Sequence, residues 1–247
     1  MIPHYHFPAS TALNRRLPKE ALYQRLNPST ALRQVFITEV QDIHWRHKLA
    51  ADTLNLTRCT DYPELQVFDI DLKTGICEVS EAVLRAIDGL IVFPIFYRLT
   101  RIFSGNTQMQ YQLAYKVPAN TESDKIKLGR YFASPWLPSP CEDTLAPLPL
   151  ALDISQLYRQ LLQTLVKSEL SAGITVIVDT RPNTLWRPLV DEPLDSWMSR
   201  LDEAARLEKR IAGLQGQLAR EKQFNRKIEL NRALNTLKQT LLALGQS

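Results

Sequence analysis

The C-terminal part of the chain carries two series of apolar residues spaced alternately four and three residues apart. The first series is Leu207, Ile211, Leu214 and Leu218, and the second is Leu230, Leu234, Leu237, Leu241 and Leu244. This spacing lines each series along one side of a helix, where it has to be buried. Leu218 and Leu230 are twelve residues apart, which is not a heptad step. We therefore predict a coiled-coil helical hairpin over residues 194–247. The alternative is one long helix with a stutter that pairs with a second subunit.

The preceding residues, 1–190, show helical and strand periodicities in turn. Helical patterns cover residues 17–26, 28–40, 79–88 and 154–170. Strand patterns cover residues 42–50, 64–73, 91–99, 109–117 and 129–136, and residues 174–178 are consistent with a short buried strand. We predict an α+β globular domain over residues 1–190, with a mixed or antiparallel sheet of about five strands and flanking helices.

The clearest strand pattern is that of residues 109–117, in which the two faces differ. One face carries Met109, Tyr111, Leu113, Tyr115 and Val117, and the other carries Gln110, Gln112, Ala114 and Lys116. Such alternation predicts an antiparallel sheet with one face in water.

Prolines, glycines and capping residues predict where several elements begin and end. Pro94 indicates that its strand lies at an edge or contains a bulge. Ser80 is the expected N-cap of the third helix, and Gly89 is placed to close the same helix. Asp153 is expected to cap the fourth helix, with Gln156 at the capping-box position.

An acidic strand motif, QVFDIDLKTG, is the first candidate for catalysis. Asp69, Asp71 and Lys73 alternate along a strand and therefore share one face. Metal-dependent nucleases use carboxylates to hold Mg²⁺ and a lysine beside the attacking water. A further acid would be needed, and the upstream choices are Asp52, Asp61 and Glu64. The simpler interpretation is the solvent face of a half-buried strand.

The histidines and glycines give no cofactor or metal motif. His44 and His47 are three residues apart, so an unbroken strand would place them on opposite faces. His4 and His6 lie near the N-terminus, and no Cys or Glu cluster completes a tetrahedral site. Neither GxxxxGK, GxGxxG nor GxSxG occurs, which argues against P-loop enzymes, dinucleotide enzymes and α/β-hydrolases. We assign no metal site and no cofactor. The only catalytic candidates are the residues of the acidic motif, Asp69, Asp71 and Lys73.

Basic residues cluster where the predicted hairpin turns. Arg220, Lys222, Arg226 and Lys227 lie between the two leucine series. Such residues can contact the phosphates of a nucleic acid. The alternative is that they belong to the solvated flanks of a coiled coil, which are always rich in charge.

Composition places the chain among folded proteins without a membrane span. Of its 247 residues, 45% are apolar, and the formal net charge is +4. No run approaches the roughly 20 apolar residues that span a bilayer, and the first residues show no signal-peptide pattern. The three cysteines, Cys59, Cys77 and Cys141, are far apart in sequence. We expect reduced thiols and a cytoplasmic location.

Five segments of the chain resemble one known family. They are LPKEALYQRL, HKLAADTLNL, VLRAIDGLIVFPIFYRL, QYQLAYK and REKQFNRKIELNRALNTLK. Together they resemble the bacterial domain-of-unknown-function family forty-three ninety-one, and the likeness runs through most of the chain. The resemblance implies a cytoplasmic protein encoded beside helicase and DNA-methyltransferase genes in restriction-type phage-defence clusters. It implies an accessory role and transfers no catalytic residue.

Our first functional expectation is a non-enzymatic subunit that docks onto a DNA-processing partner, a helicase or DNA methyltransferase subunit. The predicted partner-binding residues are Leu207, Ile211, Leu214, Leu218, Leu230, Leu234, Leu237 and Leu241. Exposed apolar stripes usually mark a partner, which for these residues includes a second copy of the chain. The first alternative is a Mg²⁺-dependent nuclease with Asp71 and Lys73 at its centre. The second is a DNA-binding module.

Overall fold

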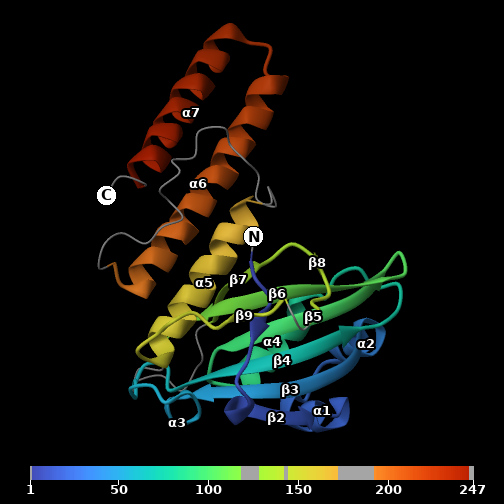
Figure 1. Ribbon diagram of the computed structural model, residues 1–247. Coiled ribbons are helices and arrows are strands. Elements are labelled where there is room, and N and C mark those ends of the chain that lie inside the picture. Colours follow the sequence, from blue (N-terminus) through green and yellow to red (C-terminus); the bar gives the residue numbers. More distant parts are fainter. Residues whose placement is uncertain (1, 118–127, 142–143, 172–191, 245–247) are drawn as a thin grey trace. The chain divides into compact units, whose positions relative to one another are not determined.

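A seven-stranded mixed sheet lies at the centre of the N-terminal part of the chain in the computed structural model (Figure 1). The structure describes residues 2–117, 128–141, 144–171 and 192–244. The strand order is β2-β3-β4-β5-β6-β7, and β8 also pairs with β6. The strands are β2 (Ala12–Arg16), β3 (Val40–Ala50), β4 (Glu64–Leu72), β5 (Ile95–Phe103), β6 (Asn106–Lys116), β7 (Leu128–Ala133) and β8 (Leu137–Pro138).

The direction of the strands makes the sheet mixed. Among the described strands of this sheet, β4 and β5 run parallel, and the other neighbours run antiparallel. The parallel pair is joined through helix α4 (Glu81–Leu90), as a parallel crossover requires. The predicted α+β class with a mixed sheet is confirmed. The sheet exceeds the five or so strands expected because β2 and β8 are short and show no apolar alternation.

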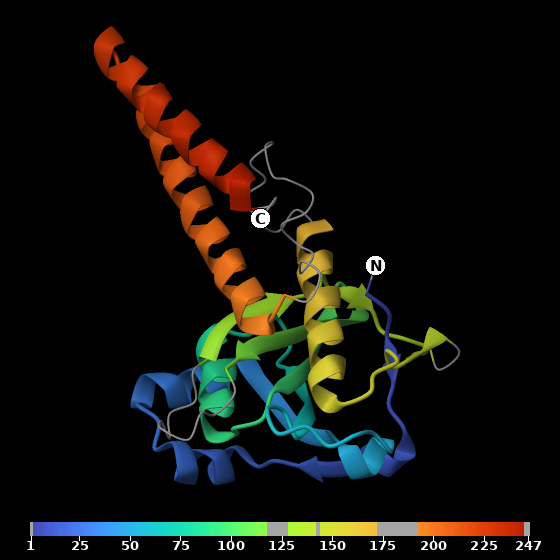
Figure 2. The same ribbon diagram turned by 90° about the vertical axis from the view of Figure 1, so that its left-hand side faces the viewer.

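Helices cover both faces of the sheet (Figure 2). Besides α4 they are α1 (Lys19–Leu26), α2 (Thr30–Glu39), α3 (Ala51–Leu54) and α5 (Ile154–Ser171). In Figure 2, α5 (yellow) lies on the opposite side of the sheet from α1 and α2 (blue) and α4 (green). The two sides are referred to below as the α4 face and the α5 face. The core of the α4 face includes Leu22, Phe36 and Val83 from the three helices and Phe68 and Tyr97 from the sheet.

The N-terminal segment is held on the α5 face by a second, small sheet. Strand β1 (Tyr5–His6) pairs in parallel with β9 (Ala146–Pro147). The ring of Tyr5 meets Phe96 of β5 edge-on at 6.3 Å. A single 3-10 turn, Ala9–Thr11, then leads into β2.

The prediction that one face of β6 lies in water is wrong. Gln110, Ala114 and Lys116 are buried, although they are the residues expected on the wet face. Gln112, which shares their face, is opposite Tyr97 in the register, and Tyr97 belongs to the core under α4. The polar face of β6 is therefore covered by a helix, and its polar groups are satisfied inside the protein.

The predictions for Pro94 and Gly89 are also wrong. Pro94 precedes β5, which lies inside the sheet, and its carbonyl accepts a hydrogen bond from the Gln66 N–H at 2.9 Å. Gly89 lies within α4, which continues to Leu90. The Lys116 ammonium binds carbonyl oxygens at the end of this helix. The ammonium group of a lysine from the sheet, rather than a glycine, thus satisfies carbonyl groups at the C-terminal end of α4.

The two predicted helix caps are present in modified form. Ser80 occupies the N-cap position of α4 without a side-chain capping bond, and its N–H donates to the Glu39 carboxylate at 2.7 Å. Asp153 accepts the Gln156 N–H at 2.7 Å and so caps α5 as predicted. The Gln156 side chain accepts from the N–H of Leu152 at 2.7 Å rather than from that of Asp153.

The C-terminal part is a helical hairpin, as predicted. Helices α6 (Leu194–Arg220) and α7 (Phe224–Leu244) pack against each other. The turn, residues 221–223, contains neither Gly nor Pro, and the Glu221 carboxylate stabilises it. This carboxylate accepts the N–H groups of Lys222 and Gln223 at 2.7 and 2.9 Å. Those hydrogen bonds satisfy two backbone donors of the turn, just before α7 begins.

The chain divides into two compact units, Met1–Ala172 and Gly173–Ser247. The α+β fold belongs to the first and the hairpin to the second. The predicted boundary at residues 190–194 and the predicted strand at residues 174–178 fall wholly or partly outside the described residues.

Candidate functional site

The acidic motif lies on β4 with its two carboxylates on the α5 face. Phe68 and Ile70 are fully buried in the core of the α4 face, so Asp69 and Asp71 point the other way, as predicted. Lys73 lies just beyond the end of β4, and its N–H donates to the Glu39 carbonyl at 2.9 Å. Because Lys73 is outside the strand, the alternation of β4 does not place its side chain on the same face as Asp69 and Asp71.

Two arginines neutralise the Asp69 carboxylate. Arg98 binds both of its oxygens, with Nε–Oδ1 at 2.6 Å and Nη2–Oδ2 at 2.9 Å. Arg46 adds a third contact, Nε–Oδ2 at 2.8 Å. The Asp69 side chain is only 15% exposed, so these charged hydrogen bonds are partly shielded from water. Three of the roughly four lone-pair sites of the Asp69 carboxylate are thus used by guanidinium groups, whose positive charges also oppose a metal ion there.

Asp71 is close to two other carboxylates, those of Asp69 and Asp42. Burial, and then the Asp69 charge, raise the pKa of the Asp71 carboxyl above its usual value. Asp71 is opposite Asp42 of β3, and Asp42 is paired with Arg16 at 2.5 Å. Within the described ranges, no group of three or more His, Cys, Asp or Glu side chains is placed to hold a metal ion.

The further acids considered for a nuclease lie in other pockets. Asp52 and Glu64 line one surface pocket, and Asp61 lines another; neither includes Asp69 or Asp71. Glu64 begins the same strand, so it lies roughly 23 Å from Asp71 at about 3.3 Å per residue. The structure thus brings together two of the predicted acids and leaves the others apart.

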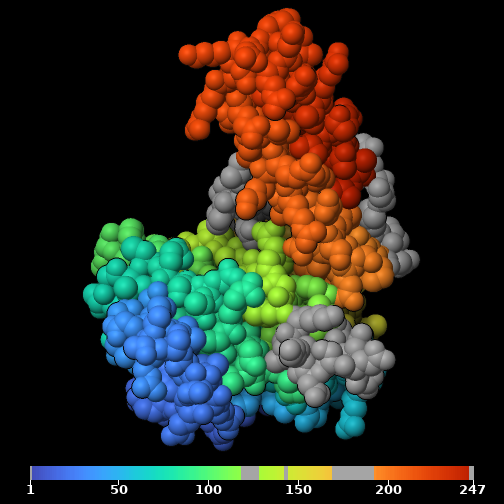
Figure 3. All heavy atoms as spheres, turned by 180° about the vertical axis from the view of Figure 1, so that it is seen from behind, coloured from blue at the N-terminus to red at the C-terminus, as the bar shows by residue number. Residues whose placement is uncertain are grey.

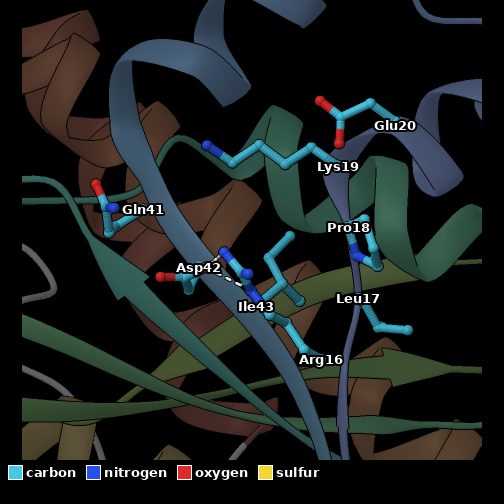
Figure 4. Close-up of a pocket in the computed structure, with 8 residues that line it drawn as sticks. All are labelled: Arg16, Leu17, Pro18, Lys19, Glu20, Gln41, Asp42 and Ile43. Carbon is cyan, nitrogen blue, oxygen red and sulfur yellow. Dashed lines mark hydrogen bonds and ion pairs between the residues drawn. The ribbon is translucent and has the colours of Figure 1, made fainter.

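A pocket of about 270 Å³ lies where the chain passes from β2 into α1 (Figure 4). Its lining residues are Arg16, Leu17, Pro18, Lys19, Glu20, Gln41, Asp42 and Ile43. Three of its four charged side chains are engaged within the protein, because Arg16 binds Asp42 and the Lys19 ammonium binds the Val40 carbonyl. Burial, and then the Lys73 charge, lower the pKa of Lys19. Lys73 therefore acts electrostatically on this pocket.

The prediction that His44 and His47 lie on opposite faces is wrong. His44 pairs with Asp69 and His47 pairs with Val67, and a register shift lies between Trp45 and His47. Asp69 and Val67 share a face, so the two histidines share it as well. A bulge in the middle of β3 inserts the extra residue, and no sequence period signals it.

His47 fixes the N-terminal segment to the α5 face. Its ring stacks on Phe7 at 4.8 Å, and its Nδ1 lies 3.0 Å from the Thr11 hydroxyl. The Arg98 guanidinium lies 5.4 Å from the centre of the same Phe7 ring. Burial, and then the Arg98 charge, lower the pKa of His47 to about 4. The residues around Asp69 thus form a network that joins the N-terminal segment to strands β3, β4 and β5.

The lowered pKa of His47 predicts acid sensitivity. The free energy of unfolding should fall as pH is lowered from about 6.5 to about 4, because the unfolded chain takes up a proton that the folded one does not. Above pH 6.5 the ring is neutral in both states and this contribution is constant. Urea unfolding at a series of pH values measures the effect. In His47→Phe, which keeps a ring against Phe7, this part of the pH dependence should disappear; an unchanged profile would contradict the assignment.

The leucine series fill the space between the two helices of the hairpin. Leu207, Ile211 and Leu241 are buried in one cluster with Ala204. The remaining predicted partner-binding residues divide by burial: Leu230 and Leu234 are buried, and Leu214, Leu218 and Leu237 are partly buried. These residues, called the leucine seam below, are thus covered by the other helix of the hairpin. Their role in binding a partner stays a prediction.

The four basic residues predicted at the turn are together at the end of the hairpin. Arg220 ends α6, Lys222 lies in the turn, and Arg226 and Lys227 lie in the first turn of α7. All four are exposed. Long side chains extend from this end of the hairpin in the space-filling view (Figure 3). Phe224, which is not among the predicted site residues, begins α7 and is 76% exposed.

Comparison with known families agrees with the resemblance found in the sequence. A family model described as Domain of unknown function (DUF4391) matches residues 6–241. The chain belongs to this family. The match to DUF4391 includes both the α+β unit and most of the hairpin, so the two units are parts of one family pattern. No curated protein and no solved structure matches the chain.

None of the helices in the described part of the chain is long and apolar enough to cross a bilayer.

Proposed function

We propose that this protein is a non-enzymatic accessory subunit of a bacterial restriction-type defence complex. It docks in the cytoplasm onto a DNA-processing partner, a helicase or DNA methyltransferase subunit. Membership of the DUF4391 family supports the proposal through the gene neighbourhood that the resemblance implies. The observation that carries it is the hairpin, a compact unit of two helices with its own apolar core.

The hairpin suits binding because it is formed before any partner arrives. Ile211 and Leu241 are fully buried in its core. Burying such a side chain contributes about 1.5–3 kcal/mol, so the arms do not separate at little cost. A partner that used the leucine seam would have to open it. Docking is therefore expected on the outer, charged surface of α6 and α7, where the backbone is already helical and only side chains have to be ordered on binding.

The surroundings of Asp69 favour a structural role for the acidic strand motif. A nuclease metal site needs carboxylate oxygens with available lone pairs. Both oxygens of Asp69 accept hydrogen bonds from Arg98, and one also accepts from Arg46. These contacts, together with the stacking of Phe7 on His47, join three strands and the N-terminal segment.

Co-purification from the native host tests the proposal. The tagged full-length protein should bring down its helicase or methyltransferase neighbour. Ile211→Asp places a charge in the seam and should separate the arms, so the neighbour should be lost while the α+β unit stays folded. Ile211→Leu keeps the seam apolar and serves as the matched control, which should retain the neighbour. Recovery of the neighbour with Ile211→Asp, despite a loss of helical circular dichroism, would contradict docking through the hairpin.

A further inference from the structure

Phe224 is exposed at the turn of the hairpin, where the core does not need it. It is the first residue of α7 and is 76% exposed. Ile228, one helical turn later, is 37% exposed on the same side of the helix. The first residue of α7 buried in the hairpin is Leu230. Most of Phe224 and more than a third of Ile228 are therefore left outside the hairpin core at the tip, residues 220–229.

The surroundings of Phe224 are positively charged. Arg226 is the one tip cation with a described ion pair, at 3.0 Å to Glu229. In the described part of the chain, Arg220, Lys222 and Lys227 form no ion pair. The acid nearest in sequence, Glu221, is held by backbone N–H groups of the turn, which lower the pKa of its carboxyl. Three cations without a described ion pair thus lie within four positions of an exposed aromatic ring in the sequence, and the basic residues of the tip outnumber its acids, Glu221 and Glu229.

This combination matches the chemistry of a single-stranded nucleic acid. An aromatic ring stacks on any unpaired base, and lysines and arginines contact the adjoining phosphates. Amide side chains, here Gln223 and Asn225, are exposed beside the ring and can hydrogen-bond to base edges. An anionic membrane fits less well, because interfacial binding needs a broad apolar face and the tip offers two apolar side chains.

We propose that the hairpin tip binds single-stranded nucleic acid, with Phe224 stacking on a base and Arg220, Lys222 and Lys227 contacting phosphates. This site goes beyond docking onto a protein partner. It holds or fails independently of the proposed function, because its test contains no partner protein.

Fluorescence anisotropy of the full-length protein with a labelled oligodeoxythymidylate tests the site. Phe224→Ala should weaken binding by roughly 5- to 150-fold, the measured range for losing one stacked base. Phe224→Trp should bind at least as tightly as the wild type. Lys222→Ala and Lys227→Ala should each reduce the slope of log K against log salt by about 0.7. Leu150→Ala removes an apolar side chain that is even more exposed, at 95%, from the other unit and should change nothing.

Several results would overturn the site. One is unchanged affinity in Phe224→Ala with unchanged helical circular dichroism. Another is equal affinity for duplex and single-stranded DNA, since a duplex offers no unpaired base for stacking. Binding to anionic phospholipid vesicles that depends on Phe224, without oligonucleotide binding, would assign the tip to membranes instead. A parallel series with oligouridylate tells whether RNA or DNA is preferred, and the absence of binding to either would reject the proposal.

Discussion

Replacing Lys116 by methionine should lower the free energy of unfolding of the α+β unit by about 3–5 kcal/mol. The Lys116 side chain is 1% exposed and lies 2.8 Å from the Asp88 carboxylate, which is buried to the same extent. Its ammonium also donates to the carbonyl oxygens of Asp88, Ile91 and Phe93 at 3.1, 2.5 and 2.8 Å. Lys116→Met fills the same space but leaves a buried carboxylate without its counter-ion and three acceptors without a donor. Urea unfolding followed by circular dichroism measures the loss.

The matched control for this change removes both charges. Lys116→Met combined with Asp88→Leu leaves no unpaired charge, so the double variant should recover much of the stability lost by Lys116→Met alone. The recovery will be incomplete, because the hydroxyl groups of Tyr97 and Tyr131 also donate to Asp88. A loss below about 1 kcal/mol for Lys116→Met, the size of a surface ion pair, would contradict the account.

Asp69→Asn should lower the free energy of unfolding by about 2–3 kcal/mol. The change leaves Arg98 and Arg46 with a neutral partner that cannot accept from both guanidinium groups through charged oxygens. The estimate lies below that for a fully buried pair because Arg46 is 37% exposed. The same urea experiment measures it, and the N-terminal segment should become more accessible to protease, since Phe7 packs on Arg98.

Lys73→Ala is the control that separates a structural network from a nuclease site. Lys73 lies beyond the end of β4, and replacing it should change stability by no more than about 0.5 kcal/mol. A nuclease of the acid-x-Lys type would instead cut plasmid DNA with Mg²⁺ and lose that activity in Lys73→Ala. Mg²⁺-dependent cleavage that vanishes in this variant would restore the catalytic interpretation of the strand.

The parts of the fold that the sequence predicts correctly depend on contacts between neighbours in the chain. The leucine spacing determines both arms of the hairpin, and the break between Leu218 and Leu230 marks the turn. The Asp153 cap follows the same rule, because its hydrogen bond spans three residues. Local periodicity and capping need no knowledge of the rest of the protein.

The errors arise where a distant residue decides the outcome. The strand pattern predicts that Lys116 is exposed to solvent. In the structure it is buried beneath α4 and binds carbonyl groups more than twenty positions earlier. Gly89 is not needed as a helix stop for the same reason. His47 changes face because β3 contains a bulge, which depends on its pairing with β4. Such contacts leave no trace in a window of ten residues.

The candidate sites show the same division. The basic residues of the tip were identifiable because the turn brings near neighbours in sequence together. The neutralisation of Asp69 was not, since Arg46 and Arg98 come from the strands on either side of β4. Phe224 could have been singled out by one signal, a lone aromatic residue in the polar run AREKQFNRK.

The pairing of β1 with β9 has a consequence for synthesis of the protein in the cell. Tyr5 lies beside Ala146, so the segment made earlier must wait until the ribosome has added roughly 140 further residues. At roughly 5–20 residues per second, the wait is on the order of ten seconds or more. During that interval the segment of Tyr5 and Phe7, which pack against Phe96 in the folded protein, lacks the strand that holds it in place. A ribosome-associated chaperone that binds aromatic-rich nascent chains would therefore find a target in the segment that carries Tyr5 and Phe7.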